Sequence, residues 1–128
     1  MTLPRPPRIL VVEDDVRFAS FLRDALTEFG YAVEVAASGT DALNKVTEGA
    51  PDLVLLDLNL PDMPGFEVLE RLRGRSSTVP VVIVSGNTDP MMAEAAVALG
   101  AVDYITKPVD LDVLSRAVAV TLTGRDSL

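Results

Sequence analysis

Short apolar runs alternate with longer amphipathic segments along most of the chain. Five of these runs have the length of a strand, and they span 9–12, 31–36, 53–56, 79–84 and 101–105. A run that is apolar at every position, such as Leu53–Leu56, is typical of a strand buried on both faces of a parallel sheet. The run at 31–36 instead alternates apolar with small or polar residues, which predicts a strand nearer the sheet edge.

The segments between the strands carry apolar residues at helical spacing. They predict five helices, at about 16–29, 39–48, 66–74, 90–99 and 111–122. Asp14 or Asp15 can cap the first helix, and Thr88 or Asp89 can cap the fourth. Gly74 is expected to close the third.

Five strands, each followed by a helix across short loops, imply right-handed crossovers and a parallel sheet. We therefore predict one α/β domain: a five-stranded parallel sheet with helices on both faces, in the flavodoxin-like doubly wound (βα)5 arrangement with strand order 2-1-3-4-5. The domain is expected to span residues 8–122. Residues 1–7 hold three of the nine prolines and predict a disordered leader, and residues 123–128 a frayed tail.

Composition excludes several kinds of chemistry. The 128 residues include no cysteine and no histidine, so disulfides, thiolate nucleophiles, histidine bases and catalytic triads are excluded. Carboxylates, hydroxyls and lysine remain, and oxygen ligands favour hard cations such as magnesium or calcium. A net charge of −8 argues against direct binding of nucleic acid or of an anionic membrane. With no signal peptide and no membrane-spanning run, we expect a cytoplasmic protein.

Polar residues follow four of the predicted strands. They are Glu13, Asp14 and Asp15 after the first strand, Asp57 after the third, Ser85 after the fourth and Lys107 after the fifth. Parallel strands of this fold bring their carboxyl ends to one crevice. Carboxylates gathered there repel each other unless a cation such as Mg²⁺ compensates them, and a lysine suits a phosphoryl oxygen. Asp57, framed by apolar residues, is the best candidate nucleophile for phosphoryl transfer.

These four motifs, in this order, resemble the receiver domain of bacterial two-component response regulators. The motifs are Glu13-Asp14-Asp15, Asp57 within Leu-Leu-Asp-Leu-Asn-Leu-Pro-Asp-Met-Pro-Gly, Ser85-Gly86 and Lys107-Pro108. The resemblance covers residues 8 to about 122. It implies a phospho-accepting switch rather than an enzyme, in which Asp57 takes a phosphoryl group from a histidine on a sensor histidine kinase or a histidine phosphotransfer protein.

The resemblance also implies a metal site. Asp14, Asp57 and the backbone carbonyl of Asn59 would hold Mg²⁺, and Glu13 would act through a bound water. Glu13 stands where many members of the family have aspartate, which lengthens one arm of the site and keeps its charge.

Further roles are implied for the switch. Ser85, in place of the common threonine, and Lys107 would each bond a phosphoryl oxygen, and Tyr104 would turn inward behind Ser85. The Lys107-Pro108 peptide bond is expected to be cis. Asn59 and Asn87 lie at positions that, in the family, influence how long the phosphate lasts.

Several of these residues also have a structural alternative, and for Asp57 it is a helix cap or a turn aspartate. Asp15 can serve only as a helix cap, and Ser85 only as a turn residue. Tyr104 can serve only in strand packing, and Lys107 can be a solvated loop lysine.

Rival functions are a degenerate receiver that binds partners without phosphorylation, and a small aspartate-nucleophile phosphatase. The phosphatase needs a second acid two residues after the nucleophile, where this chain has Asn59. A flavodoxin-like cofactor carrier needs a loop rich in glycine and hydroxyls after the first strand, where three acids stand.

The last two helices suggest a contact surface. The helix at 90–99 has a single charge beyond its first turn, and the last helix carries two apolar stripes, Leu111, Leu114 and Val118, and Val113, Ala117 and Val120. Packing on a sheet needs only one stripe. We therefore expect the fourth helix, fifth strand and fifth helix to form a homodimer or effector face; the alternative is that both stripes are buried. With no effector segment after residue 122, the chain is either free-standing or a piece of a longer regulator.

Overall fold

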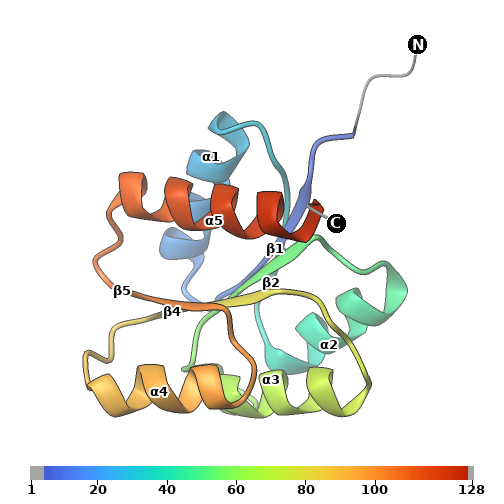
Figure 1. The fold of residues 1–128 in the computed structure, drawn as a ribbon, viewed down its shortest axis with the longest axis vertical. Helices are drawn as coiled ribbons and strands as arrows, with labels where there is room; N and C mark the ends of the chain where they lie inside the picture. Colours follow the sequence, from blue (N-terminus) through green and yellow to red (C-terminus); the bar gives the residue numbers. More distant parts are fainter. Residues whose placement is uncertain (1–4, 127–128) are drawn as a thin grey trace.

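The computed structural model describes residues 5–126 and contains ten helices and strands in strict alternation within them (Figure 1). The strands are β1 (Arg8–Val12), β2 (Ala32–Ala36), β3 (Leu53–Leu56), β4 (Val81–Ser85) and β5 (Asp103–Thr106). The helices are α1 (Val16–Glu28), α2 (Gly39–Glu48), α3 (Gly65–Gly74), α4 (Pro90–Ala98) and α5 (Leu111–Asp126).

All five strands are parallel and lie in the order β2-β1-β3-β4-β5, which confirms the predicted fold. The alternating strand, β2, is at an edge as expected. Helices α1 and α5 cover one face of the sheet, and α2, α3 and α4 cover the other (Figure 1). The winding therefore reverses between β1 and β3, where the two central strands end side by side.

The core has one layer on each face of the sheet. In β3, Leu53 and Leu55 pack towards α1 and α5, whereas Val54 and Leu56 pack towards the other three helices. All four residues are almost completely buried, because successive strand residues point to opposite faces and both faces are covered. Burial of such a side chain contributes about 1.5–3 kcal/mol each, so the central strand is fixed firmly beneath the residue that follows it.

Helix ends follow from local chemistry. Asp15, and not Asp14, caps α1, because its side chain accepts hydrogen bonds from the amides of Arg17 and Phe18. Asp89, and not Thr88, caps α4. Ser38 caps α2.

Several predicted boundaries were wrong. Helix α5 continues to Asp126, four residues beyond the expected end at Leu122, because one glycine in a helix costs only about 1 kcal/mol and does not end it. Helix α3, in contrast, ends at Gly74 as predicted, although the residue of positive φ near its end is Ser76. Residues 1–4 of the expected leader and 127–128 of the expected tail lie outside the described residues.

Strands β4 and β5 each begin two residues later than the apolar pattern suggested. Val79 and Ala101, at which the two apolar runs begin, are buried in the core but are not part of the strands. Within residues 5–126, no helix has the length and apolarity needed to cross a membrane.

Candidate functional site

The ends of β1 and β3 bring two carboxylates together. The Asp57 amide donates a 3.0 Å hydrogen bond to the Val12 carbonyl, so Asp57 lies beside Glu13, the residue that follows β1. Their exposed fractions are only 6% for Asp57 and 3% for Glu13. Two acids this deeply buried and this close require compensation by a cation or by protons.

Asp14 completes an acidic cluster. One carboxylate oxygen from each of Glu13, Asp14 and Asp57 lies within 4.8 Å of the other two. Mg²⁺ binds oxygen at about 2.0–2.1 Å, so the ligands of one octahedral ion are about 3 to 4 Å apart. The three acids are therefore a donor set that could hold a hard divalent cation.

Lys107 reaches the same cluster from the far side of β4. Its amide donates to the Ser85 carbonyl at 2.8 Å, which fixes its backbone beside the end of β4, and the Lys107-Pro108 peptide bond is cis as expected. The ammonium nitrogen lies 2.8 Å from Glu13 Oε1 and 3.7 Å from Asp57 Oδ2. One ammonium thus lies against two of the three carboxylates of the cluster.

These contacts perturb the protonation of both partners. Burial raises the pKa of the Glu13 carboxyl, and neighbouring Asp57 raises it further, while hydrogen bonds from Lys107 and from the Asp15 amide oppose the shift. Burial lowers the pKa of Lys107, but the hydrogen bond to Glu13 and the charges of Asp57 and Glu13 outweigh burial and raise it. The lysine therefore stays charged where it can neutralise an anion.

Ser85 and Tyr104 are joined through the main chain of Asn87. Ser85 is completely buried, and its Oγ accepts a 3.1 Å hydrogen bond from the Asn87 amide. The half-buried Tyr104 donates from its hydroxyl to the Asn87 carbonyl at 2.8 Å. Both side chains are therefore bound to Asn87, Ser85 to its amide and Tyr104 to its carbonyl.

The loop after β3 is held at its base and at its tip. At the base, Asn59 pairs with Pro64 in an isolated bridge and donates its amide to Asp57 Oδ1 at 3.3 Å. At the tip, the Asp62 carboxylate accepts bonds of 2.8 and 2.9 Å from the amides of Gly39 and Thr40. These bonds fasten the loop that carries Asn59 to the start of α2.

Sequence reasoning missed two residues of this region. Helical spacing marks Phe18 only as an apolar position of the first helix, but its ring centroid lies 4.3 Å from the Lys107 ammonium nitrogen. Asp62 was not singled out at all. The loop between Asp57 and Gly65 contains an acid, yet nothing local indicates that it caps a helix 22 residues earlier in the chain.

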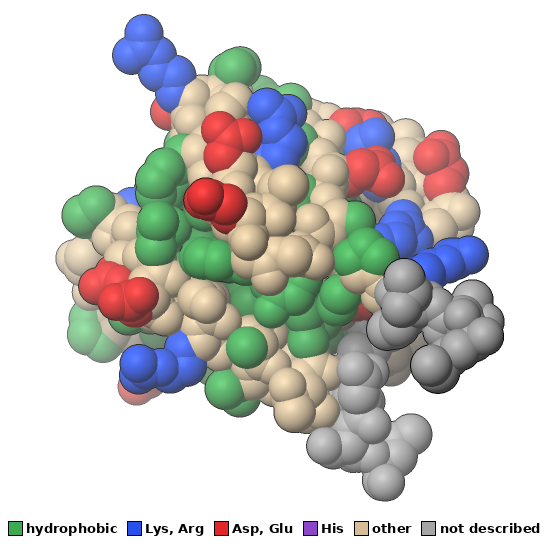
Figure 2. All heavy atoms as spheres, turned by 90° about the horizontal axis from the view of Figure 1, so that it is seen from above, with side chains coloured by type: hydrophobic (Ala, Val, Ile, Leu, Met, Phe, Trp, Pro, Cys, Tyr) green, Lys and Arg blue, Asp and Glu red, His purple; other side chains and the backbone are tan. Residues whose placement is uncertain are grey.

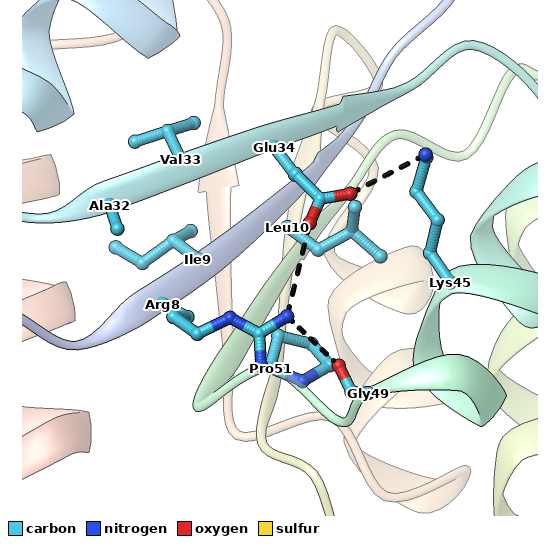
Figure 3. A pocket seen from close by; sticks show the side chains of 9 residues that line it. All are labelled: Arg8, Ile9, Leu10, Ala32, Val33, Glu34, Lys45, Gly49 and Pro51. Atoms are coloured by element: carbon cyan, nitrogen blue, oxygen red, sulfur yellow. Dashed lines mark hydrogen bonds and ion pairs between the residues drawn. The ribbon is translucent and has the colours of Figure 1, made fainter.

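A separate pocket of about 70 Å³ lies at the opposite end of the sheet, between β1, β2 and the end of α2 (Figure 3). Arg8 and Lys45 both contact Glu34 across it, at 3.8 and 3.4 Å, and Arg8 also donates to the Gly49 carbonyl. The charged side chains that line this pocket are thus paired with each other at the amino ends of the strands. This pocket is not part of the acidic site.

Comparison with known families agrees with this geometry. A model of the response regulator receiver domain matches residues 9–119, which is most of the chain. The chain belongs to the receiver-domain family. Its fold and its strand order are accordingly those of a receiver domain.

Individual relatives support the assignment to receiver domains. The transcriptional regulatory protein KdpE of Mycobacterium tuberculosis is 44% identical over 104 residues, which cover 81% of this chain and 46% of KdpE. A CheY-like receiver domain from Methanospirillum hungatei superimposes with a TM-score of 0.88 at 30% identity, covering 94% of this chain and 97% of that one. The BeF3-activated receiver domain of Klebsiella pneumoniae RstA gives 0.84 at 30% identity, with 90% and 97% covered. The chain spans about half the length of curated relatives such as KdpE.

Proposed function

We propose that this receiver domain is a phosphorylation switch in which Asp57 accepts a phosphoryl group from a phosphohistidine on a sensor histidine kinase or a histidine phosphotransfer protein. The observation that carries the proposal is the convergence of Glu13, Asp14, Asp57 and Lys107 at the ends of three strands. A chain that only packed its core would not gather three carboxylates and a lysine at one crevice.

In the proposed reaction, a lone pair of an Asp57 carboxylate oxygen forms the new P–O bond. The P–N bond of the donor phosphohistidine breaks, and its electron pair returns to the imidazole nitrogen. Lys107 donates to one phosphoryl oxygen and Ser85 Oγ to another, so both neutralise charge on the transferring group. Asp57 is therefore a phospho-acceptor, and the domain is not a conventional enzyme.

Mg²⁺ is the cofactor that this donor set fits best. Asp14, Asp57 and the backbone carbonyl of Asn59 would hold the ion, with Glu13 acting through a water. When bound, it supplies positive charge beside the transferring phosphoryl group. Before phosphorylation, Glu13 accepts the hydrogen bond from Lys107, which offsets part of the negative charge of the cluster.

Phosphorylation would then change the surface of α4, β5 and α5. Adding about 1.5–2 negative charges at Asp57 favours a hydrogen bond from Ser85, whose Oγ now accepts from the Asn87 amide. Since Tyr104 bonds the carbonyl of Asn87, movement of this segment would release or redirect the tyrosine. We propose that this is how the inward turn of Tyr104 is coupled to the phosphoryl group.

The same surface is apolar enough to bind a partner. On α5, Leu114 and Val118 are completely buried, but Val113 and Val120 are 50% and 66% exposed, so the interpretation in which both stripes are buried is wrong. On α4, Met91 is 71% exposed. Figure 2 looks onto the face that carries α1 and α5, and on this face it shows hydrophobic side chains exposed between charged ones. We propose a homodimer or effector contact on the surface of α4, β5 and α5.

A degenerate receiver that works without phosphorylation remains the second candidate, and labelling distinguishes the two. Acetyl phosphate with Mg²⁺ should add one phosphoryl group to the wild type and none to Asp57→Asn, measured by intact mass or by radiolabel. Asp52→Asn, which alters an aspartate outside the acidic cluster, is the matched control and should be labelled like the wild type. Equal labelling of the wild type and Asp57→Asn would refute the site, and no labelling of either would favour the degenerate receiver.

A further inference from the structure

The ring of Phe18 is held in a fixed place beside the acidic cluster. Its amide donates to the capping carboxylate of Asp15 at 3.2 Å, so the residue belongs to the first turn of α1. The ring packs against the core layer under α1 and α5 and stacks with Phe21 at a centroid distance of 6.0 Å and an interplanar angle of 25°. An aromatic side chain fixed in this way presents one face in a defined direction.

That face is directed at Lys107. The ammonium nitrogen lies 4.3 Å from the ring centroid, well within the distance of about 6 Å at which a cation is attracted by the ring quadrupole. The Lys107 side chain is 27% exposed, so water screens the attraction only in part. Lys107 therefore has three neighbours, namely a Glu13 oxygen, an Asp57 oxygen and the ring.

The ring differs from the other two neighbours because it carries no charge and offers no hydrogen-bond acceptor of comparable strength. It attracts the ammonium to the crevice without competing with a phosphoryl oxygen for its N–H groups. In the proposed reaction, Lys107 must exchange its 2.8 Å bond to Glu13 for a bond to the phosphoryl group on Asp57, whose Oδ2 is now 3.7 Å away. A neighbour that holds the ammonium in both positions would keep it in place during this exchange.

We propose that Phe18 is a positioning residue for Lys107: its ring holds the ammonium at the acidic cluster while the hydrogen bond moves from Glu13 to the phosphoryl group. This role rests on the proposed phosphorylation of Asp57. It concerns the intrinsic chemistry of the domain, so it should appear with a small phosphodonor and in the absence of any partner protein.

The test is a double-mutant cycle with acetyl phosphate as donor. Phe18→Leu should lower the phosphorylation rate about three- to tenfold, the range expected for loss of a partly exposed cation–π contact, and Phe18→Tyr should retain the wild-type rate. In a Lys107→Met background, Phe18→Leu should cause no further change. Phe29→Leu, at the other end of α1, is the control for loss of an aromatic from this helix. An equal effect of Phe18→Leu in both backgrounds, or none in either, would overturn the proposal.

A second measurement needs neither metal nor phosphodonor. The Lys107 ε-methylene protons should show an upfield ring-current shift by NMR in the wild type and in Phe18→Tyr, and this shift should be lost in Phe18→Leu. If the wild type accepted no phosphoryl group, the proposed function would fail while the NMR shift still tested the placement of the lysine. An unchanged shift in Phe18→Leu would show that the ring does not hold the ammonium. If thermal unfolding shows that Phe18→Leu is not folded, Phe18→Met takes its place as the apolar variant without a ring.

Discussion

Lys107 donates its shortest side-chain hydrogen bond to Glu13, a residue 94 positions earlier in the chain, at 2.8 Å. The two residues follow β5 and β1, which are separated in the sheet by β3 and β4. The lysine therefore reaches across the carboxyl ends of the central strands and passes over Asp57. In this arrangement one cation pairs with Glu13, the most deeply buried acid within residues 5–126, and lies 3.7 Å from the carboxylate of the central Asp57.

Replacing one acid of the cluster should stabilise the metal-free protein. It should also reduce the stabilisation that Mg²⁺ provides. Carboxylate oxygens within 4.8 Å repel each other, so Asp14→Asn should raise the free energy of unfolding by about 0.5–1 kcal/mol in EDTA. The wild type should gain about 2.7 kcal/mol when Mg²⁺ is present at 100 times its dissociation constant. Asp14→Asn should lose most of this gain. Urea unfolding with and without Mg²⁺ measures both effects.

Glu70→Gln is the control for that experiment, because it removes an exposed acid of α3 that is not part of the cluster. It should leave the Mg²⁺ response unchanged. Equal stabilisation by Mg²⁺ in the wild type and in Asp14→Asn would mean that the ion binds elsewhere.

The residues of the site could be predicted because each follows an apolar run that stops abruptly. A parallel sheet then brings Asp57, Glu13 and Lys107 together, whatever the details of packing. Phe18 and Asp62 could not be predicted in the same way. Helical spacing marks Phe18 as a core residue and carries no information about what lies over its ring. Asp62 caps a helix distant in sequence, whereas capping rules describe residues next to the helix.

Asp62 should make stability depend on pH in the acid range. Hydrogen bonds from the Thr40 hydroxyl and from the amides of Thr40 and Gly39 lower the pKa of Asp62 from 3.8 to about 2. The folded protein therefore binds this proton less readily than the unfolded chain, so the stabilisation is complete above about pH 4 and is lost as the pH falls towards 2. The melting temperature of Asp62→Asn should lie below that of the wild type at pH 6, and the gap should narrow as the pH falls to 2.

Asp24→Asn, which changes an exposed acid on α1, provides the comparison for Asp62→Asn. Its difference from the wild type should vary less with pH across the same range. A gap for Asp62→Asn that stayed constant from pH 6 to pH 2 would show that the three hydrogen bonds do not stabilise the carboxylate.

Arg73 should contribute more to the free energy of unfolding than Arg71, two residues earlier on the same helix. The Arg73 guanidinium donates to the carbonyls of Ser77 and Val79 from Nη1 and to the carbonyl of Gly100 from Nη2, at 2.9–3.0 Å. Lysine cannot make these bonds from two nitrogens, so Arg73→Lys should cost about 1–2 kcal/mol. Arg71→Lys alters an exposed ion pair and should cost less than about 0.5 kcal/mol. Urea unfolding of the two variants tests the difference, and equal costs would contradict it.

The exposed stripe of α5 should decide whether the activated domain associates. Val113 and Val120 are exposed, whereas Leu114 and Val118 of the neighbouring stripe are buried, so replacing the two exposed valines does not open the core. With beryllium fluoride and Mg²⁺, the wild type should form a dimer in light scattering, and Val113→Asp combined with Val120→Asp should raise its dissociation constant at least about tenfold, since two charges would be buried in an apolar contact. Val16→Asp, at a 78% exposed position on α1, should leave the dimer intact. If the wild type kept the same monomer mass with and without beryllium fluoride, and no partner protected α4 and α5 from hydrogen exchange, the proposed contact surface would be refuted.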